Sequence, residues 1–324
     1  MLVESIKNCL QLLQFIFPFL IKEYLILYSV KSYSIIRAYC DFYLIIESNK
    51  HKISIMKKYI ALLGIAFLLI ECSTVPITGR KRLNFVGDAQ VLPTSFAQYK
   101  GFLEKNKKSA DKNATAKVRN IGKNISNAVD RFMRANGMKS EADAYRWEFN
   151  LIEDKTVNAW CMPGGKVVFY TGIMPICKND DGVAAVMGHE VAHAFAKHGQ
   201  ERMSTSQIRA GAGALLAYGT KDDKNSKYFN LAYGIGSQVG MLAFSREHEA
   251  EADKLGLVFM IMAGYNGSEA AEVWVRMSKR AGKSKQPGFL STHPSNESRI
   301  QNLRAFLPEA KLLAAKYNSS PQTR

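Results

Sequence analysis

The sequence predicts a mainly helical α+β domain that contains one small β-sheet. Apolar residues recur at helical spacing in several segments, most clearly over residues 181–197. Three short strand-like segments follow one another between residues 147 and 170. From residue 72 onward the chain is about 250 residues long, which is enough for one domain with a large core.

The sheet is expected from residues 147–152, 157–162 and 166–170, the first and last of which are rich in aromatic and β-branched side chains. Gly164 and Gly165 close a tight turn between the second and third segments. A sheet of this size has a free edge. An extended peptide could add to that edge through main-chain hydrogen bonds, with little demand on its own sequence.

A buried helix is expected over residues 181–197. Asp180 or Asp181 is the predicted N-cap, and His198 with Gly199 is the predicted end.

This helix contains the pentad H-E-x-x-H at residues 189–193. Because positions four apart share a helix face, His189 and His193 can direct their imidazoles at one metal ion. Glu190 lies close to that face and could act as a general base toward a metal-bound water. His198 follows His193 by five residues, one short of the long H-E-x-x-H-x-x-G-x-x-H spacing, so we interpret it as structural. The alternative for the pentad is a core helix with two hydrogen-bonded histidines and a solvated glutamate.

A catalytic zinc site needs a third protein ligand, and the next candidate is Glu249 in a helix-compatible segment. Asp253 lies one turn later on the same face, where it could accept the second ring N–H of a ligand histidine. Glu247 and Glu251 should face elsewhere. The alternative for this segment is a solvated acidic helix face. Two imidazoles and one carboxylate favour zinc, although other divalent ions can occupy such a set.

Four elements together resemble the zinc metallopeptidases that include HtpX, the Oma-type proteases and the CAAX prenyl proteases. They are H-E-x-x-H at residues 189–193, E-x-x-A-D at 249–253, N-A-x-x-x-P-G-G at 158–165 and T-H-P at 292–294 with Arg299. The resemblance covers residues 83–307 in the family's order. It implies a gluzincin-type domain with a small sheet or hairpin beside the H-E-x-x-H helix.

The resemblance also implies roles for single residues. His189, His193 and Glu249 would be the zinc ligands, Glu190 the catalytic base, and Asp253 a neighbour often assigned as proton donor. In the implied mechanism, zinc activates a water and polarises the scissile carbonyl, and Glu190 carries the proton to the leaving amine.

The developing oxyanion needs one further donor, for which His293 and Arg299 are the candidates. The resemblance gives His293 a second possible role as a displaceable fourth ligand that inhibits the resting enzyme. The alternative for His293 is a loop histidine that stabilises a proline turn.

The N-terminal part suggests export. Residues 56–71 have the basic start and short apolar run of a signal peptide. The sequence around Cys72 resembles a bacterial lipobox, with Glu71 where a small residue is usual, so plain cleavage and an uncleaved anchor are the alternatives. Residues 1–55 are expected to come from an over-extended reading frame or to form a membrane-associated extension. We predict a lipidated linker over 72–82, the domain over 83–316 and a disordered tail over 317–324.

The formal net charge is +16, and many lysines gather over residues 105–123. Such a surface could rest against anionic lipids, or it is simply solvated. No nucleic-acid-binding module is recognised.

Cys161 and Cys177 could pair in an oxidising compartment, or they are ordinary buried thiols. Two segments rich in Ala and Gly, at 208–218 and 231–244, are each shorter than a membrane-spanning helix and are expected to pack in the core or to touch the membrane.

These observations predict a zinc metalloendopeptidase that acts on unfolded or misfolded envelope proteins. We expect it to be a lipoprotein in the bacterial cell envelope, anchored at Cys72, facing the periplasm and favouring the outer membrane. The alternative function is a latent or chaperone-like binding module with a self-capped zinc site. A purely structural zinc site would have no use for Glu190.

Overall fold

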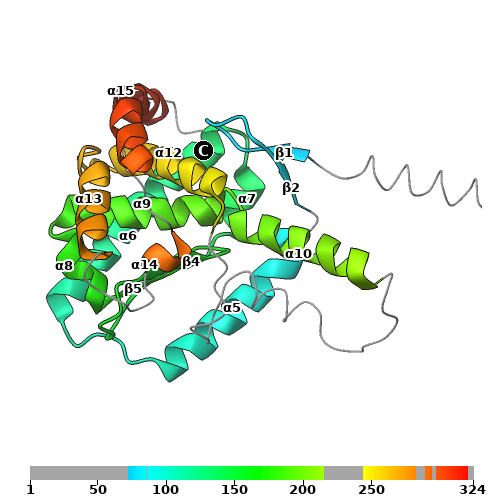
Figure 1. The fold of residues 1–324 in the computed structure, drawn as a ribbon, viewed down its shortest axis with the longest axis horizontal. Helices are drawn as coiled ribbons and strands as arrows, with labels where there is room; N and C mark the ends of the chain where they lie inside the picture. The colour runs from blue at the N-terminus through cyan, green and yellow to red at the C-terminus, as the bar shows by residue number, and fades with distance from the viewer. Residues whose placement is uncertain (1–71, 85, 215–243, 282–288, 294–296, 320–324) are drawn as a thin grey trace, which may run out of the picture. The chain divides into compact units, whose positions relative to one another are not determined.

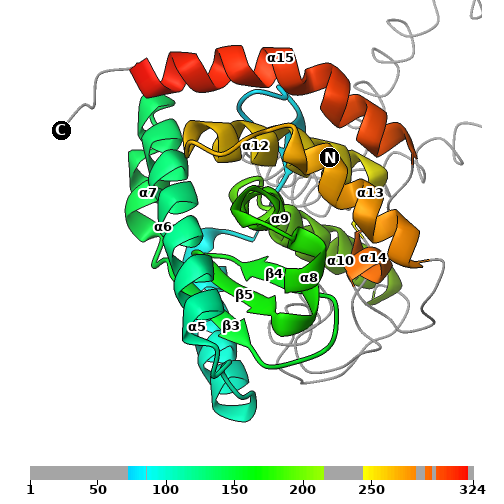
Figure 2. The same ribbon diagram turned by 90° about the vertical axis from the view of Figure 1, so that its left-hand side faces the viewer.

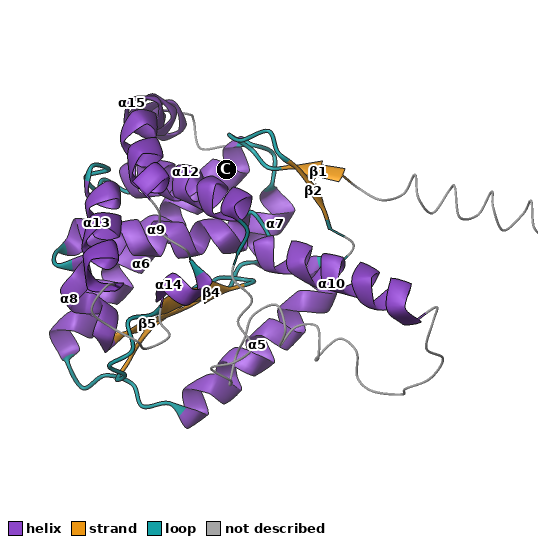
Figure 3. Ribbon diagram, in the orientation of Figure 1, coloured by secondary structure: helices purple, strands orange, loops and turns teal. Residues whose placement is uncertain are grey.

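The computed structural model describes residues 72–84, 86–214, 244–281, 289–293 and 297–319. All of them belong to one structural unit of the chain. Helices dominate these residues and the sheets are small, which confirms the predicted mainly helical α+β class (Figure 3).

The strands are short and the helices vary from one turn to almost seven turns (Figure 1). The strands are β1 (Cys72–Thr74), β2 (Lys81–Leu83), β3 (Glu148–Ile152), β4 (Ala159–Met162) and β5 (Lys166–Tyr170). The helices are α5 (Asp88–Lys105), α6 (Lys112–Ala135), α7 (Lys139–Ala144), η1 (Thr171–Ile173), α8 (Met174–Cys177), α9 (Asp180–Phe195), α10 (His198–Ala214), α12 (Arg246–Met262), α13 (Glu269–Ala281), α14 (Phe289–Thr292) and α15 (Glu297–Ser319).

The three predicted strand segments form one sheet with the order β3-β5-β4. β5 pairs in parallel with β3 and antiparallel with β4. The hairpin between β4 and β5 turns at Gly164 and Gly165, whose φ angles of 79° and 84° suit glycine. β4 is therefore an edge strand, and it lies next to α9.

α9 is the central element of the domain (Figure 2). The sheet lies on one side of it and α12 on the other, and α6 and α13 also pack against it. Every residue of α9 from Gly182 to Phe195 is buried, as expected for a helix that is largely apolar all round.

Both ends of α9 differ from the prediction. The N-cap is Asn179, whose side chain accepts a hydrogen bond from the backbone N–H of Gly182, and Asp180 is the first helical residue. At the other end α9 stops at Phe195, and α10 begins at His198. Lys197 between them has a φ of 58°, a left-handed conformation that interrupts the helix.

The segment predicted as a linker is a folded part of the domain. Residues 72–83, which we call the N-terminal strap, form the antiparallel ribbon β1-β2. Val75 within it is fully buried in the main core. The domain boundary therefore lies before residue 83, because the strap contributes an apolar side chain to the core.

The C-terminal helix extends further than predicted. α15 continues through Ser319, so the first three residues of the predicted tail at 317–324 are helical. Tyr317 packs against Phe132 with ring centroids 4.5 Å apart, and the side-chain amide of Asn318 donates to the backbone carbonyl of Met262. These contacts hold the last turn in place.

Several predictions lie outside the described residues. These are the predictions for residues 1–71, for most of the two segments rich in Ala and Gly, and for the last five residues of the tail. Within the described residues, none of the helices combines the length and the hydropathy needed to cross a bilayer.

Candidate metal centre and active site

α9 and α12 bring the three predicted metal ligands together. The Nε2 atoms of His189 and His193 lie 3.1 Å apart. One carboxylate oxygen of Glu249 lies 3.3 Å from Nε2 of His193, and the other lies 3.5 Å from Nε2 of His189. All three side chains are buried.

These distances fit one small cation. Ligand atoms about 2.0–2.1 Å from a tetrahedral zinc ion are roughly 3.3 Å from one another. The observed separations of 3.1, 3.3 and 3.5 Å agree with that value. Two imidazole nitrogens and a carboxylate therefore converge as they would around a metal ion.

His293 supplies a fourth converging atom from the segment that follows α14. Its Nδ1 lies 2.9 Å from a carboxylate oxygen of Glu249 and 3.3 Å from Nε2 of His189. The candidate ligand atoms of His189, His193, Glu249 and His293 all lie within 4.8 Å of one another. The backbone N–H of Phe244 donates to the carbonyl of Thr292, which fixes the segment carrying His293 beside the start of α12.

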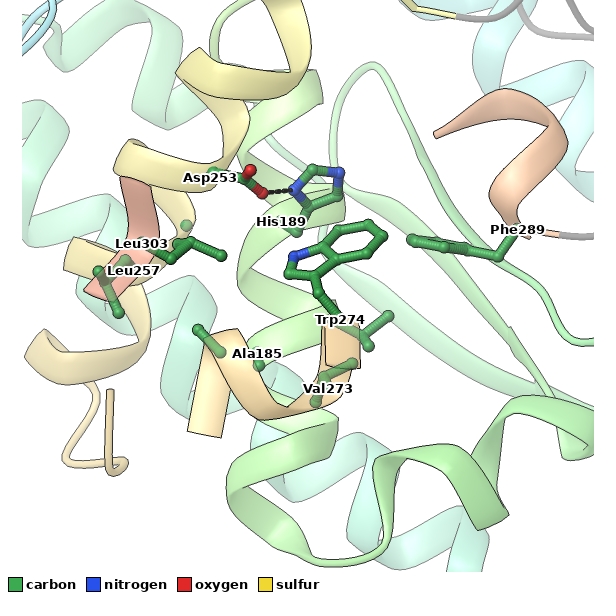
Figure 4. A pocket seen from close by; sticks show the side chains of 11 residues that line it. Ala185, His189, Asp253, Leu257, Val273, Trp274, Phe289 and Leu303 are labelled. Atoms are coloured by element: carbon green, nitrogen blue, oxygen red, sulfur yellow. Dashed lines mark ion pairs between the residues drawn. The ribbon is translucent and has the colours of Figure 1, made fainter. Parts of the chain in front are cut away.

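Asp253 and Arg299 lie on the outer side of this cluster. One oxygen of Asp253 is 3.0 Å from Nδ1 of His189, so the nitrogen of that ring turned away from the cluster faces a carboxylate (Figure 4). The Arg299 guanidinium forms a bidentate pair with Asp253, at 2.8 and 2.6 Å, and reaches Glu249 at 2.6 Å. His189 and Glu249 are thus each held in place by a residue on the side turned away from the cluster.

Of the two predicted oxyanion donors, His293 lies beside Glu190, with Nε2 3.6 Å from its carboxylate. Arg299 is instead directed at the two carboxylates of α12.

An aromatic layer supports His189. The ring centroid of Trp274 on α13 lies 5.3 Å from that of His189 and 5.6 Å from that of Phe289 (Figure 4). The guanidinium carbon of Arg299 lies 3.7 Å from the Trp274 ring centroid, a cation–π contact. No short motif marks Trp274, so only the tertiary fold reveals its place.

His198 lies behind His193, in agreement with its interpretation as structural. The Nδ1 atoms of the two rings are 2.8 Å apart, and Nε2 of His198 lies 2.9 Å from Glu251. Phe244 covers the other side, with its ring centroid 4.0 Å from that of His193. Phe244 has no sequence signal, because it precedes α12 without any motif.

Glu190 points into a pocket beside the cluster. It is 2 % exposed, and its Oε1 makes no hydrogen bond with any protein atom among the described residues. Burial raises the pKa of its carboxyl group above the usual value. The pocket is lined by Asn158, Ala159, Trp160, Cys161, Glu190, His193, Ala194, Gly199, Arg202, Phe244, Thr292 and His293.

The buried histidines and carboxylates of the cluster shift one another's pKa values. Burial by itself would raise the pKa of Glu249, but the three surrounding histidines hold that pKa far below its usual range. Burial also works to lower the pKa of His189, and the carboxylates of Asp253 and Glu249 outweigh it and raise the pKa to about 9. The carboxylates of Asp253 and Glu249 therefore favour positive charge on His189.

Cys161 and Cys177 are both free and buried. Of the two possibilities given by the sequence, a disulfide or ordinary buried thiols, the structure has the second. Burial raises the pKa of Cys177 to about 12, which keeps the thiol protonated.

Comparison with known proteins agrees with this geometry. The model of peptidase family M48 matches residues 122–307, more than half of the chain. The chain is 36 % identical over 189 residues to the mitochondrial metalloendopeptidase OMA1 of Schizosaccharomyces pombe, covering 58 % of this chain and 53 % of that protein. It is 32 % identical over 271 residues to OMA1 of Saccharomyces cerevisiae, covering 78 % of this chain and 75 % of that protein.

A bacterial relative matches over a smaller share of both chains. The putative beta-barrel assembly-enhancing protease of Vibrio cholerae is 31 % identical over 163 residues, covering 48 % of this chain and 34 % of that protein. The chain thus spans between one third and three quarters of the length of these relatives. The family model covers more than half of the chain and the relatives agree with it, so the chain belongs to peptidase family M48.

Proposed function

We propose that this protein is a zinc-dependent endopeptidase, in which His189, His193 and Glu249 hold the metal and Glu190 is the catalytic base. The observation that carries the proposal is the convergence of two imidazole nitrogens and the carboxylate of Glu249 beside a second buried carboxylate, that of Glu190, which faces a pocket. The names of the relatives, which are metalloendopeptidases and proteases, support the same activity.

Zinc bound there would activate a water and polarise the scissile carbonyl. Glu190 would receive the proton of that water at Oε1, which makes no hydrogen bond to any of the described residues, and would then pass it to the leaving amine. Asp253 and Arg299 would orient His189 and Glu249, in keeping with their contacts behind these two side chains.

The substrate would bind in an extended form along β4. This edge strand contributes Ala159, Trp160 and Cys161 to the pocket that contains Glu190. Main-chain hydrogen bonds to an edge strand depend little on side chains, which favours unfolded or misfolded segments as substrates.

His293 would cap the site in the resting enzyme. Its Nδ1 occupies the position of a fourth ligand, close to His189 and Glu249. A substrate carbonyl or a water would have to displace it. The comparisons give no support to the alternative function, a chaperone-like module, because the relatives are named as proteases.

We further propose that the enzyme acts on damaged proteins of a bacterial envelope, as a lipoprotein anchored at Cys72, facing the periplasm and favouring the outer membrane. The resemblance of the residues before Cys72 to a lipobox supports the anchor. Two relatives named as beta-barrel assembly-enhancing proteases, from Vibrio cholerae and Escherichia coli, support an envelope role.

The test is hydrolysis of casein by the purified full chain, with bound zinc quantified in the same samples. Glu190→Gln should retain zinc and lose cleavage, whereas Glu247→Gln, an exposed glutamate of α12, should keep both. Bound zinc without cleavage, both by the unaltered chain and by His293→Ala, which lacks the cap, would reject the proposed activity, and a chain that binds no zinc would reject the metal site.

A further inference from the structure

The N-terminal strap is connected to the metal centre through a chain of polar contacts that are partly buried at the strap and fully buried near the cluster. Arg80 is its central residue. Its Nε donates to Glu251 at 2.8 Å, and its two terminal nitrogens each donate to Glu201 at 2.9 Å. Thr78 of the same strap donates to the other oxygen of Glu251. The strap thereby contacts both α10, through Glu201, and α12, through Glu251.

The contacts continue from Glu251 to the metal cluster. Glu251 lies 2.9 Å from Nε2 of His198, and Nδ1 of His198 lies 2.8 Å from Nδ1 of His193. His198 is 0 % exposed and Glu251 is 3 % exposed, so water does not replace either contact. The ring of His198 stacks on that of His248, with centroids 4.3 Å apart, which fixes its plane.

The hydrogen-bond pattern assigns the protons along this chain. A carboxylate only accepts hydrogen bonds, so Nε2 of His198 must carry a proton toward Glu251. His198 then offers the bare Nδ1 as an acceptor, and His193 donates its Nδ1–H. The lone pair of His193 is left on Nε2, which faces His189 and Glu249. A proton on that nitrogen would point into the ligand cluster and would prevent it from binding a metal.

We propose that Arg80, Glu251 and His198 are positioning residues that set the tautomer and orientation of His193, so that the N-terminal strap determines metal affinity. This inference deepens the proposed metal site and rests on it. Glu251 lies two residues from Glu249 and from Asp253, yet it faces away from the metal cluster toward the strap. One face of α12 thus presents the carboxylates of Glu249 and Asp253 to the two ligand histidines. Another face presents Glu251, which reaches His193 only through His198.

The decisive comparison is between three variants and the unaltered full chain. His198→Ala removes the acceptor of His193. His198→Asn restores a side-chain oxygen near the former position of Nδ1. Arg80→Ala leaves His198 in place and removes the charged contact of the strap with Glu251, while the hydrogen bond from Thr78 remains. Arg276→Ala is the matched control, because Arg276 is also a partly buried arginine with a carboxylate partner, Glu269, and lies away from the metal cluster.

The measurement is the Zn²⁺ dissociation constant, obtained by competition with a chromophoric chelator, together with the visible spectrum of the Co²⁺ form. We expect His198→Ala to weaken Zn²⁺ binding by about 10- to 100-fold, the usual effect of removing a partner of a ligand histidine. His198→Asn should recover part of that loss, and Arg80→Ala should fall between His198→Ala and the control. The Co²⁺ spectrum should change in His198→Ala and stay unchanged in Arg276→Ala.

Equal affinities for His198→Ala, Arg80→Ala and the unaltered chain would overturn the inference, as would an equal loss in Arg276→Ala. Circular dichroism of the metal-free proteins tests folding. If His198→Ala does not fold, the Zn²⁺ dissociation constants of His198→Asn and Arg80→Ala decide, and values equal to that of the unaltered chain overturn the inference. Because binding is measured without a substrate, failure of the proposed peptidase activity would leave this inference standing.

Discussion

Gly188 of α9 and Gly256 of α12 meet backbone to backbone where the two helices cross. A Cβ atom built on Gly188 would lie 2.6 Å from the carbonyl oxygen of Gly256, and one built on Gly256 would lie 2.7 Å from the backbone nitrogen of His189. No side chain fits between the helices at this point. The close approach lets Glu249 reach His189 and His193 from the neighbouring helix.

Gly256→Ala should therefore separate α12 from α9. Alanine is the better helix former by about 1 kcal/mol, but the obstacle to its methyl group is rigid backbone, so the clash should prevail. We expect the free energy of unfolding to fall by about 1–3 kcal/mol and Zn²⁺ binding to weaken. Denaturant titration and chelator competition measure the two effects.

Gly101→Ala is the control, because Gly101 lies within α5 and a Cβ there would meet nothing within 4 Å. It should be neutral or stabilising by up to about 1 kcal/mol. A Gly256→Ala chain as stable as the unaltered one would show that the crossing can open without cost.

Arg299→Ala should be strongly destabilising, because it would leave the carboxylates of Asp253 and Glu249 buried without their guanidinium partner. Breaking a buried ion pair in this way costs about 3–5 kcal/mol. Lysine should not restore the loss, since it cannot form the bidentate pair or the flat contact with Trp274. Arg304→Ala, which breaks an exposed pair with Glu272, should cost no more than about 1 kcal/mol. Unfolding of the metal-free proteins would separate these outcomes.

His293→Ala should raise the turnover number at saturating zinc, because it would free the position that His293 occupies beside Glu249 and His189. Zinc binding should weaken at the same time, by at least the roughly 10-fold typical of lost ligand support. Steady-state kinetics over a range of zinc concentrations test both. A fall in the turnover number would instead assign His293 to the oxyanion.

Glu201 should make stability depend on pH. Burial acts to raise its pKa, but the contacts with His248 and Arg80 prevail and lower the pKa from 4.5 to about 2. The ionised form is favoured in the folded state, so its stabilisation is complete above pH 4.5 and is lost as the pH falls toward 2. After allowing for partial exposure, the contribution is about 1–2 kcal/mol.

The Glu201→Gln chain should accordingly be less stable than the unaltered chain at pH 6, and the gap should narrow by pH 3. Denaturant titrations at the two pH values measure the gap. A gap that is constant with pH would mean that Glu201 acts through packing rather than through its charge.

The local part of the site could be predicted from the sequence because it depends on helix periodicity. His189, Glu190 and His193 are fixed relative to one another by α9 alone, and Glu249 and Asp253 by α12 alone. That the two helices meet depends on Gly188 and Gly256, which look like ordinary helix-weakening residues in the sequence.

The remaining contacts depend on parts of the chain that carry no recognisable pattern. Residues 72–82 are predicted as a lipidated linker because they follow the lipobox-like segment at Cys72, whereas the fold uses Thr78 and Arg80 to hold Glu251. The strand segments could be located, but alternation does not specify that β5 pairs in parallel with β3 and antiparallel with β4.

The burial of α9 from Gly182 to Phe195 also has a consequence for how the enzyme can be controlled. A helix enclosed on every side opens only in the rare fluctuations that disrupt the whole core, so its amide protons should be among the slowest to exchange with solvent. The proposed metal ligands His189 and His193 therefore cannot be withdrawn by local melting of α9. Any regulator must act instead on the peripheral pieces that border the site, which are the segments carrying His293 and Phe244 and the strap.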